Sequence, residues 1–309
     1  MIEHTHDHAP KSFGKIFAIG IFLNFGFVLI EAWGGWRSDS LALIADAGHN
    51  LSDVGGMLLA WVAYAVSKLK PNSTHTFGWR KASVLAGFAN ALMLIFGMGS
   101  LAWEAAHRFQ HPEAVDSVTV MLISGVGIMI NGFTAWMFST GSQKDSNIRG
   151  AFLHMASDAL VSAGVLIAGG LTLWKGWLWM DPLISLAIAF LIILSTWSLL
   201  KNSLHQLFDG VPPDVNLDEV RLALLALPNV QSIHSLHVWS ISTSEIALTA
   251  HLVLDRQAGT NDELLSAAEK MLHEGFEITN VTLQIESQTY IQSYSASSPT
   301  GRTSTSCES

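Results

Sequence analysis

Long apolar runs separated by short polar loops occupy the first two thirds of the chain. A helix needs about 20 apolar residues to cross a bilayer. Six segments have this length, at about residues 13–36, 41–67, 82–106, 115–139, 150–173 and 178–200. None of the connecting loops is long enough to fold by itself. The pattern therefore predicts an α-helical membrane protein with six transmembrane helices within residues 13–201.

Beyond residue 201 the pattern changes to that of a small folded domain. After a Pro-Pro break in FDGVPPDVNLDEV, residues 215–226 and 261–275 are typical of helices. Three stretches are typical of strands, at residues 232–242, 245–255 and 278–287. This αββαβ order predicts an α+β domain at residues 214–288, joined to the helices by a linker at residues 202–213. Residues 1–12 form a histidine-containing tail, and the Ser/Thr-rich residues 289–309 are expected to be disordered.

Composition supports a membrane protein and excludes several other classes. Half of the residues are hydrophobic and only 13% are charged, which is too apolar for an ordinary soluble domain. The net charge of −9, without a Lys/Arg cluster, does not suggest a nucleic-acid partner. The single cysteine, Cys307, excludes an intrachain disulfide framework. No G-x-x-x-x-G-K-[ST] loop is present, so ATP-driven transport lacks its phosphate cradle.

The positions of lysine and arginine predict how the helices are oriented. Cytoplasmic loops of membrane proteins carry the excess of positive charge. With six spans, nine of these residues fall on one side and three on the other, so both termini are expected in the cytoplasm. The nine are Lys11, Lys15, Lys68, Lys70, Arg80, Lys81, Lys144, Arg149 and Lys201, and the three are Arg37, Arg108 and Lys175.

Two H-x-x-x-D motifs lie where lipid-facing residues would be expected. His49 and Asp53 are four residues apart in the second span, and His154 and Asp158 are four apart in the fifth. Residues at this spacing share one face of a helix. The two spans run antiparallel, so their polar faces can meet, although the expected helix bounds place the pairs at somewhat different depths. Two nitrogen and two carboxylate donors suit tetrahedral Zn²⁺. The alternative is that each pair is only a local hydrogen-bonded contact.

An ordered series of motifs resembles the cation diffusion facilitator family, in its zinc- and cadmium-exporting branch. The series comprises the two H-x-x-x-D motifs, HTFGWRKAS at 75–83, HSLHVW at 234–239 and TLQIES at 282–287. The resemblance covers about residues 13–287. It implies a homodimeric six-helix transporter in a bacterial inner membrane, with a cytoplasmic metallochaperone-like domain, that exchanges Zn²⁺ for protons. The implied transport site is His49, Asp53, His154 and Asp158.

Histidines on the predicted hairpin indicate a second metal site. His234 and His237 are three residues apart, so in a regular strand only one of them shares a face with His251. A turn centred on Ser244 would favour His237, and a shift by one residue would favour His234. The resemblance implies that His234, His251 and Glu286 bind a regulatory metal ion. The alternative is that they are surface or structural polar groups.

Several further polar residues are weaker candidates. Members of the cation diffusion facilitator family have a further metal site on the loop after the second span. His75 corresponds to one ligand of that site, whereas Asn72 and Trp79 occupy the positions of the other ligands. Asp46 lies near the face of His49 and is a candidate to hydrogen-bond and orient a metal ligand, or to form part of a proton or metal path. The tract HTHDH offers three metal-capable histidines, His4, His6 and His8. Interhelical hydrogen bonding is expected for five polar residues in or near the spans, namely Asn24, Glu31, Asn90, Glu104 and Asn131.

Together these features predict a secondary transporter for zinc, with cadmium as a further substrate, rather than an enzyme. Zinc binding requires neutral imidazoles and ionised carboxylates, so zinc and protons compete for the same atoms. Alternating access would convert this competition into Zn²⁺/H⁺ antiport. An intramembrane metalloenzyme needs an open coordination position, which four protein ligands would fill. A metal sensor, which would bind zinc without transmembrane flux, is the remaining alternative. The expected partners are divalent metal ions, protons, membrane lipid and a second copy of the chain.

Overall fold

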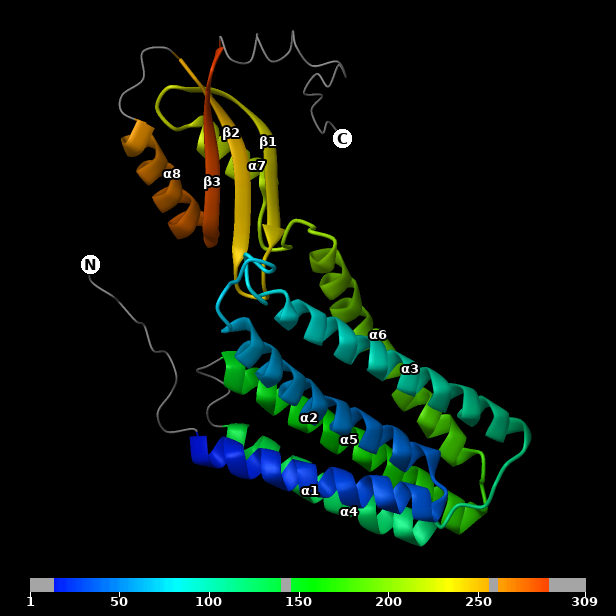
Figure 1. Cartoon of the computed structure of the whole chain (residues 1–309). Coiled ribbons are helices and arrows are strands. Elements are labelled where there is room, and N and C mark those ends of the chain that lie inside the picture. Colours follow the sequence, from blue (N-terminus) through cyan, green and yellow to red (C-terminus); the bar gives the residue numbers. More distant parts are fainter. Residues whose placement is uncertain (1–13, 140–145, 256–260, 289–309) are drawn as a thin grey trace. The chain divides into compact units, whose positions relative to one another are not determined.

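The first two thirds of the protein form six long helices, as the apolar pattern predicts. The computed structural model describes residues 14–139, 146–255 and 261–288. Within the described residues, four helices are long and apolar enough to cross a membrane by length and composition, α3 to α6. The helices are α1 (Gly14–Ser38), α2 (Leu41–Ser67), α3 (Ala82–Gln110), α4 (Ser117–Ser139), α5 (Ser146–Lys175) and α6 (Met180–Leu207) (Figure 1).

The chain divides into two compact units. The first comprises the residues up to Leu59 together with Ala89–Leu200, and the second comprises Ala60–Phe88 together with the residues from Lys201 onward. The boundary therefore falls within α2, α3 and α6.

The helical unit has an apolar interior and large apolar side chains on its exterior. Phe27, Leu43 and Val165 are almost completely buried in its core. By contrast, Trp103 and Trp136 are 79% and 68% exposed. A soluble bundle would hide such side chains, whereas a membrane bundle turns them to lipid. The exposed faces thus fit a bundle that is solvated by a bilayer.

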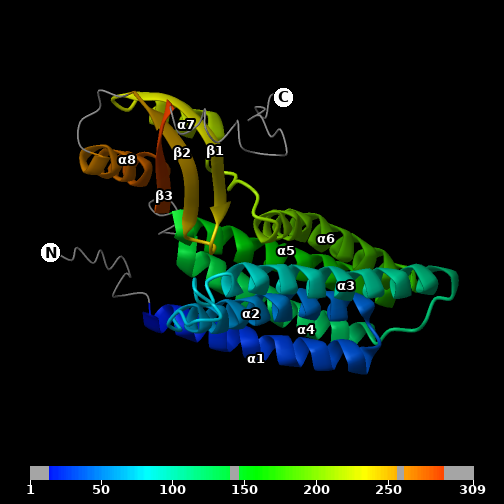
Figure 2. The same cartoon turned by 45° about the horizontal axis from the view of Figure 1, so that its top comes forward.

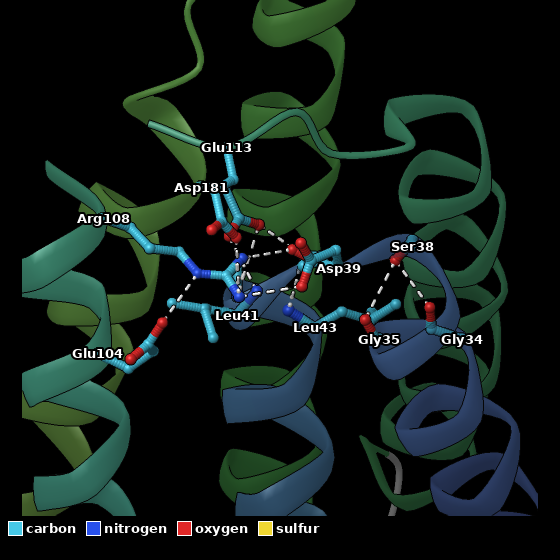
Figure 3. Close-up of polar contacts among 12 residues, drawn as sticks. Gly34, Gly35, Ser38, Asp39, Leu41, Leu43, Glu104, Arg108, Glu113 and Asp181 are labelled. Atoms are coloured by element: carbon cyan, nitrogen blue, oxygen red, sulfur yellow. Dashed lines mark hydrogen bonds and ion pairs between the residues drawn. The ribbon is translucent and has the colours of Figure 1, made fainter. Parts of the chain in front are cut away.

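Polar side chains hold the first turn of α2, the helix that carries the first H-x-x-x-D motif. The Asp181 carboxylate, at the start of α6, accepts the backbone N–H of Leu41 at 2.9 Å and that of Ala42 at 3.4 Å. It also accepts a short hydrogen bond from the Ser40 hydroxyl. These amides have no partner within their own helix. Asp181 therefore acts as an N-terminal cap supplied by another helix (Figure 3).

Arg108 holds the turn that precedes α2. Its guanidinium is 2.9 Å from the Asp39 carboxylate and donates to the Asp39 carbonyl at 2.8 Å. Glu104 and Glu113 lie 3.3 Å and 3.4 Å from the same guanidinium. Asp39 has a φ of +57°, a conformation that costs energy for a residue other than glycine. Figure 3 shows Arg108 between these carboxylates, where it stabilises the strained turn.

Replacing Asp181 by alanine is expected to destabilise the helical unit by about 1–3 kcal/mol, because buried N–H donors and the Ser40 hydroxyl lose their acceptor. Thermal unfolding of the protein in detergent measures this loss. Glu113→Ala serves as the matched control, because an exposed ion pair contributes about 0–1 kcal/mol. Equal unfolding temperatures for the two variants would contradict the proposed cap.

The second unit contains the predicted αββαβ domain. Its elements are α7 (Leu217–Leu225), β1 (Val230–Ser240), β2 (Ile246–Leu254), α8 (Asn261–Phe276) and β3 (Ile278–Ser287). The sheet order is β1-β2-β3, with β1 antiparallel to β2 and β3 parallel to β2. A parallel pair needs a crossover connection, and α8 provides it, as Figure 2 shows. The predicted fold class is confirmed.

This domain has its own hydrophobic core. Leu224 of α7, Leu248 and Leu252 of β2, and Leu272 of α8 are all at most 1% exposed. The Asn216 side chain accepts the backbone N–H groups of residues 218 and 219 and so starts α7.

The loop between α2 and α3 and the first turn of α3 contact other parts of the second unit through two ion pairs and a hydrogen bond. Arg80 Nη1 lies 2.6 Å from Glu245 Oε2, and Lys81 forms an ion pair with Asp209. The Thr243 backbone N–H, in the turn of the β1–β2 hairpin, donates to the Ser83 hydroxyl at 3.2 Å.

Candidate metal sites

The two H-x-x-x-D motifs meet between α2 and α5. His49 Nε2 lies 3.8 Å from Asp53 Oδ2 and 3.5 Å from Asp158 Oδ1. His154 Nε2 lies 3.3 Å from Asp53 Oδ2 and 3.6 Å from Asp158 Oδ2. Each imidazole thus faces the carboxylate of its own helix and that of the other helix. His49, Asp53 and His154 have ligand atoms within 4.8 Å of one another, and Asp158 lies beside both histidines.

The difference in depth suggested by the sequence is not present in the structure. The imidazole rings of His49 and His154 are 6.0 Å apart between centroids, in an edge-to-face arrangement. Helix α5 begins at Ser146, four residues before the expected start at residue 150. His154 therefore lies in the third turn of a continuous helix rather than close to its end.

The nitrogen–oxygen separations are compatible with ligands of one tetrahedral metal ion. Ligands about 2.0 Å from zinc at tetrahedral angles lie about 3.3 Å from one another. The observed nitrogen–oxygen separations of 3.3–3.8 Å are close to this value. Asp53 Oδ2 and Asp158 Oδ2 are buried and have no hydrogen-bond partner. Asp158 is 1% exposed. Buried acceptors without donors are costly, and a cation would satisfy both.

Asp46 belongs to the same face of α2 but has different partners. It is completely buried, and its Oδ2 accepts a hydrogen bond from the Ser162 hydroxyl of α5 at 3.0 Å. The adjacent turn of α2 carries Asn50, whose amide donates to Glu31 Oε2 of α1 at 3.0 Å. Asp46 and Glu31 therefore form a second buried group of carboxyls, one turn from His49.

The expected interhelical hydrogen bonds are observed in part. Glu31 accepts from Asn50 across α1 and α2, and Asn90 of α3 accepts from Ser52 of α2 at 3.4 Å. Glu104 instead pairs with Arg108 of its own helix. Asn131 of α4 is completely buried, and neither polar atom of its side chain has a hydrogen-bond partner. Side-chain contacts of Asn24 lie outside the described part of the structure.

In the second unit, one residue from each strand contributes to a second cluster. His234 Nε2 of β1 lies 2.8 Å from Glu286 Oε2 of β3, and His251 Nδ1 of β2 lies 2.8 Å from Glu286 Oε1. The amide of Gln284 donates to Glu286 Oε1, also at 2.8 Å. Glu286 is 5% exposed, so this carboxylate is buried between two imidazoles. The cluster offers two nitrogen donors and one oxygen donor to a metal ion.

A bulge in β1 decides which histidine joins this cluster. His237 pairs with Thr249, but His234 pairs with His251, and the register shifts between the two histidines. Ser235, inside the bulge, has a φ of +50°. The extra residue brings His234 opposite His251 and leaves His237 exposed. The sequence left the choice between the two histidines to the register, but in the structure the bulge selects His234.

His75, the weaker histidine candidate that lies within the described residues, joins neither cluster. Among the described residues, the groups able to hold a metal ion are His49, Asp53 and His154, together with Asp158 beside them, and the strand cluster. His75 stacks on Trp79, with ring centroids 4.2 Å apart, and its backbone N–H donates to the Asn72 side chain at 2.8 Å. His4, His6 and His8 lie outside the described residues.

Comparison with known proteins matches both parts of the chain to one family. Residues 17–208 match the family model described as the cation efflux transmembrane domain. Residues 212–288 match the model described as the cytoplasmic domain of cation efflux proteins. The two matches cover the helices and the αββαβ domain in the predicted order.

Individual relatives extend over nearly the whole chain. The cadmium, cobalt and zinc/H(+)-K(+) antiporter of Bacillus subtilis is 36% identical over 290 residues, 92% of this chain and 93% of the antiporter. The zinc transporter ZitB of Escherichia coli is 34% identical over 291 residues, 93% of this chain and 92% of the transporter. A solved metal-bound C-terminal domain of the CzcD transporter from Cupriavidus metallidurans is 40% identical. It covers 23% of this chain and 99% of that domain, with a TM-score of 0.23.

Proposed function

Because this chain belongs to the cation diffusion facilitator, or cation efflux, family, we propose that it exports cytoplasmic Zn²⁺ in exchange for protons. The protein is a multi-pass membrane transporter for metal cations and not an enzyme. Zinc binds to His49, Asp53, His154 and Asp158, and the site opens alternately to the two sides of the membrane. Cadmium is the second substrate.

The observation that carries this proposal is the convergence of two imidazoles and two carboxylates between α2 and α5. A divalent cation inside a bilayer needs charge compensation from the protein. The carboxylates of Asp53 and Asp158 supply two negative charges, and the histidines supply nitrogen ligands that zinc prefers over oxygen. Four ligands also complete a tetrahedral shell, so no position remains for the water that a catalytic zinc ion would use.

Proton exchange follows from the chemistry of these same four side chains. Zinc binds only neutral imidazoles and ionised carboxylates, so protons must leave before the metal ion enters. After zinc departs, a low-dielectric site disfavours two bare negative charges. Protons from the outer side therefore replace the metal ion. The protonated site then opens toward the cytoplasm and releases its protons there. The cycle carries zinc outward and protons inward.

Two further features belong to the proposal. The excess of lysine and arginine on one side supports cytoplasmic termini, so the αββαβ domain is cytoplasmic. This domain also joins two chains in a homodimer, which the match of residues 212–288 to the ZT_dimer model supports. His234, His251 and Glu286 bind a regulatory zinc ion in that domain. The buried carboxylate between two histidines supports this assignment, because it places three donors of zinc-compatible chemistry together.

Zinc uptake into proteoliposomes tests the proposed antiport. With an acidic lumen and zinc outside, zinc is expected to accumulate in the lumen to at least about 10-fold the level reached without a pH gradient, since each pH unit adds a factor of ten to the equilibrium zinc ratio per exchanged proton. A protonophore should abolish the difference. Uptake that does not respond to the gradient would contradict proton coupling. Zinc binding without any flux would identify the protein as a sensor.

A further inference from the structure

Glu31 and Asp46 form a pair of carboxyl groups buried in the helical unit. Both side chains are 0% exposed, and they lie on α1 and α2, which the apolar pattern of the sequence predicts to cross the membrane. Ionisable groups are costly in this environment and are usually kept for a function. The four ligands proposed for zinc do not include either residue.

Each carboxyl group of the pair has one oxygen with a donor and one without. Asn50 donates its amide to Glu31 Oε2, and Ser162 donates its hydroxyl to Asp46 Oδ2, both at 3.0 Å. Glu31 Oε1 and Asp46 Oδ1 are buried and have no donor. The two carboxyl groups are close enough to act electrostatically on each other. Two ionised carboxylates repel each other and offer only acceptors, whereas one shared proton would remove the repulsion and supply a donor.

We propose that Glu31 and Asp46 form a proton-binding site, distinct from the metal site, that carries a proton exchanged for zinc. In the loaded state one carboxyl group bears an O–H bond and donates to the other, so the pair holds one proton and one negative charge. On release this O–H bond breaks, the proton leaves, and two carboxylates remain, held by Asn50 and Ser162. This inference rests on the proposed antiport function and adds its proton carrier.

The surroundings favour a proton over a metal cation as the ligand. Metal ions take four or more ligands in proteins, whereas only two oxygens of this pair are unpaired. The other two oxygens face the hydrogen atoms of Asn50 and Ser162, which would repel a cation. A proton needs only the two oxygens between which it is shared. The two free oxygens are enough to bind a proton, and the two neighbouring donors disfavour a metal cation.

The charged groups around the pair connect it to the metal site. Among the groups that act on it electrostatically, His49 of α2 and Asp158 of α5 belong to the metal site. Helix α4, which packs against α1, carries no titratable residue. The carboxylates of α3 and α6 are engaged elsewhere, Glu104 with Arg108 and Asp181 with Ser40.

This arrangement couples proton release to zinc binding through charge. Asp46 precedes His49 by three residues, about 4.5 Å along the helix axis, and Ser162 follows Asp158 by one turn. A divalent ion at the metal site favours the fully ionised pair, since opposite charges attract strongly in a low dielectric. Zinc binding therefore releases the shared proton, and zinc departure restores it. The pair adds one proton to those exchanged by the metal ligands themselves.

Counting protons in Glu31→Gln tests the proposal, because glutamine keeps the size and the acceptor oxygen but cannot share a titratable proton. Zinc binding to the full-length protein is measured calorimetrically in buffers of different ionisation enthalpy, which reports the protons released per zinc ion. The variant is expected to release fewer protons than the native chain, by about one per zinc. Zinc should still bind. An unchanged proton count in a variant that binds zinc would overturn the proposal.

Ser124→Ala is the matched control. Ser124 is also completely buried, but its hydroxyl donates to the Val120 carbonyl of its own helix at 2.9 Å. Its removal should leave the proton count unchanged. If this control lowered the count equally, the effect would arise from altered packing, and the assignment to Glu31 and Asp46 would be wrong.

Infrared difference spectroscopy of the native protein provides a measurement that does not depend on the folding of a variant. Zinc addition should remove the carbonyl band of one protonated carboxylic acid, and Asp46→Asn should lack this change. Absence of a protonated acid in the zinc-free native chain would overturn the inference. By contrast, the proposed function itself fails if the native chain shows no proton-linked zinc flux. A flux that responds to potassium rather than protons, and only while Glu31 is present, would also overturn the proton assignment.

Discussion

Replacing Asp158 by asparagine is expected to lower zinc flux by at least about 100-fold, because even residues that only support metal ligands cost 10–100-fold in affinity. Asp158 is 1% exposed, and its two oxygens lie 3.5 Å from His49 Nε2 and 3.6 Å from His154 Nε2. Asparagine keeps the shape but removes a negative charge. A divalent ion would then face one carboxylate instead of two in a low-dielectric site, where uncompensated charge is costly.

Zinc uptake into proteoliposomes and zinc affinity in detergent measure this effect together. The matched control is Ser157→Ala, since Ser157 is the neighbouring residue on α5 but is exposed and donates only to the Leu153 carbonyl of its own helix. The control should retain native flux. Native flux in Asp158→Asn would exclude the four-residue site from transport. Loss in both variants would indicate general disruption of α5.

His234→Ala is expected to remove one bound zinc ion per chain from the cytoplasmic domain, whereas His237→Ala should leave it in place. The two histidines lie on the same strand, three residues apart, but only His234 contacts Glu286. The loss of His234 would leave one nitrogen and one carboxylate. Two ligands are too few for the closed tetrahedral shell of a non-catalytic zinc site.

Both substitutions are made in the Asp158→Asn background, so that the transport site does not obscure the count. Zinc per chain is then determined by equilibrium dialysis and elemental analysis of the full-length protein. Equal loss in the two histidine variants would contradict the bulged register as the determinant of the site. No loss in either variant would assign His234, His251 and Glu286 to a structural hydrogen-bonded cluster instead.

The sequence predicts most of the fold because its elements depend on local patterns. Spans of about 20 apolar residues leave few alternatives to transmembrane helices. Alternating positions after residue 230 likewise indicate strands, and the predicted αββαβ order is the one observed. Errors are confined to element ends. For instance, α5 starts at residue 146 rather than 150, because the polar residues that begin it resemble a loop.

The hairpin marks where local pattern stops being sufficient. A two-residue periodicity assigns residues to faces only while the strand is regular. The bulge at Ser235 breaks this periodicity. The sequence has no glycine at this position that would have indicated a bulge. Family resemblance selected His234, but the physical reason for the choice is the bulge itself, which only the paired strands reveal.

What the sequence by itself determined is therefore the set of helices and strands, together with the spacing that places His49 with Asp53 and His154 with Asp158. Only the tertiary structure decided that these pairs meet, that Asp181 caps α2, and that Glu31 lies beside Asp46. The physical reason is that helical periodicity specifies which residues share a face of one helix, whereas the neighbour of that face depends on how separate helices pack. Contacts between residues on separate helices leave no periodic trace in the chain.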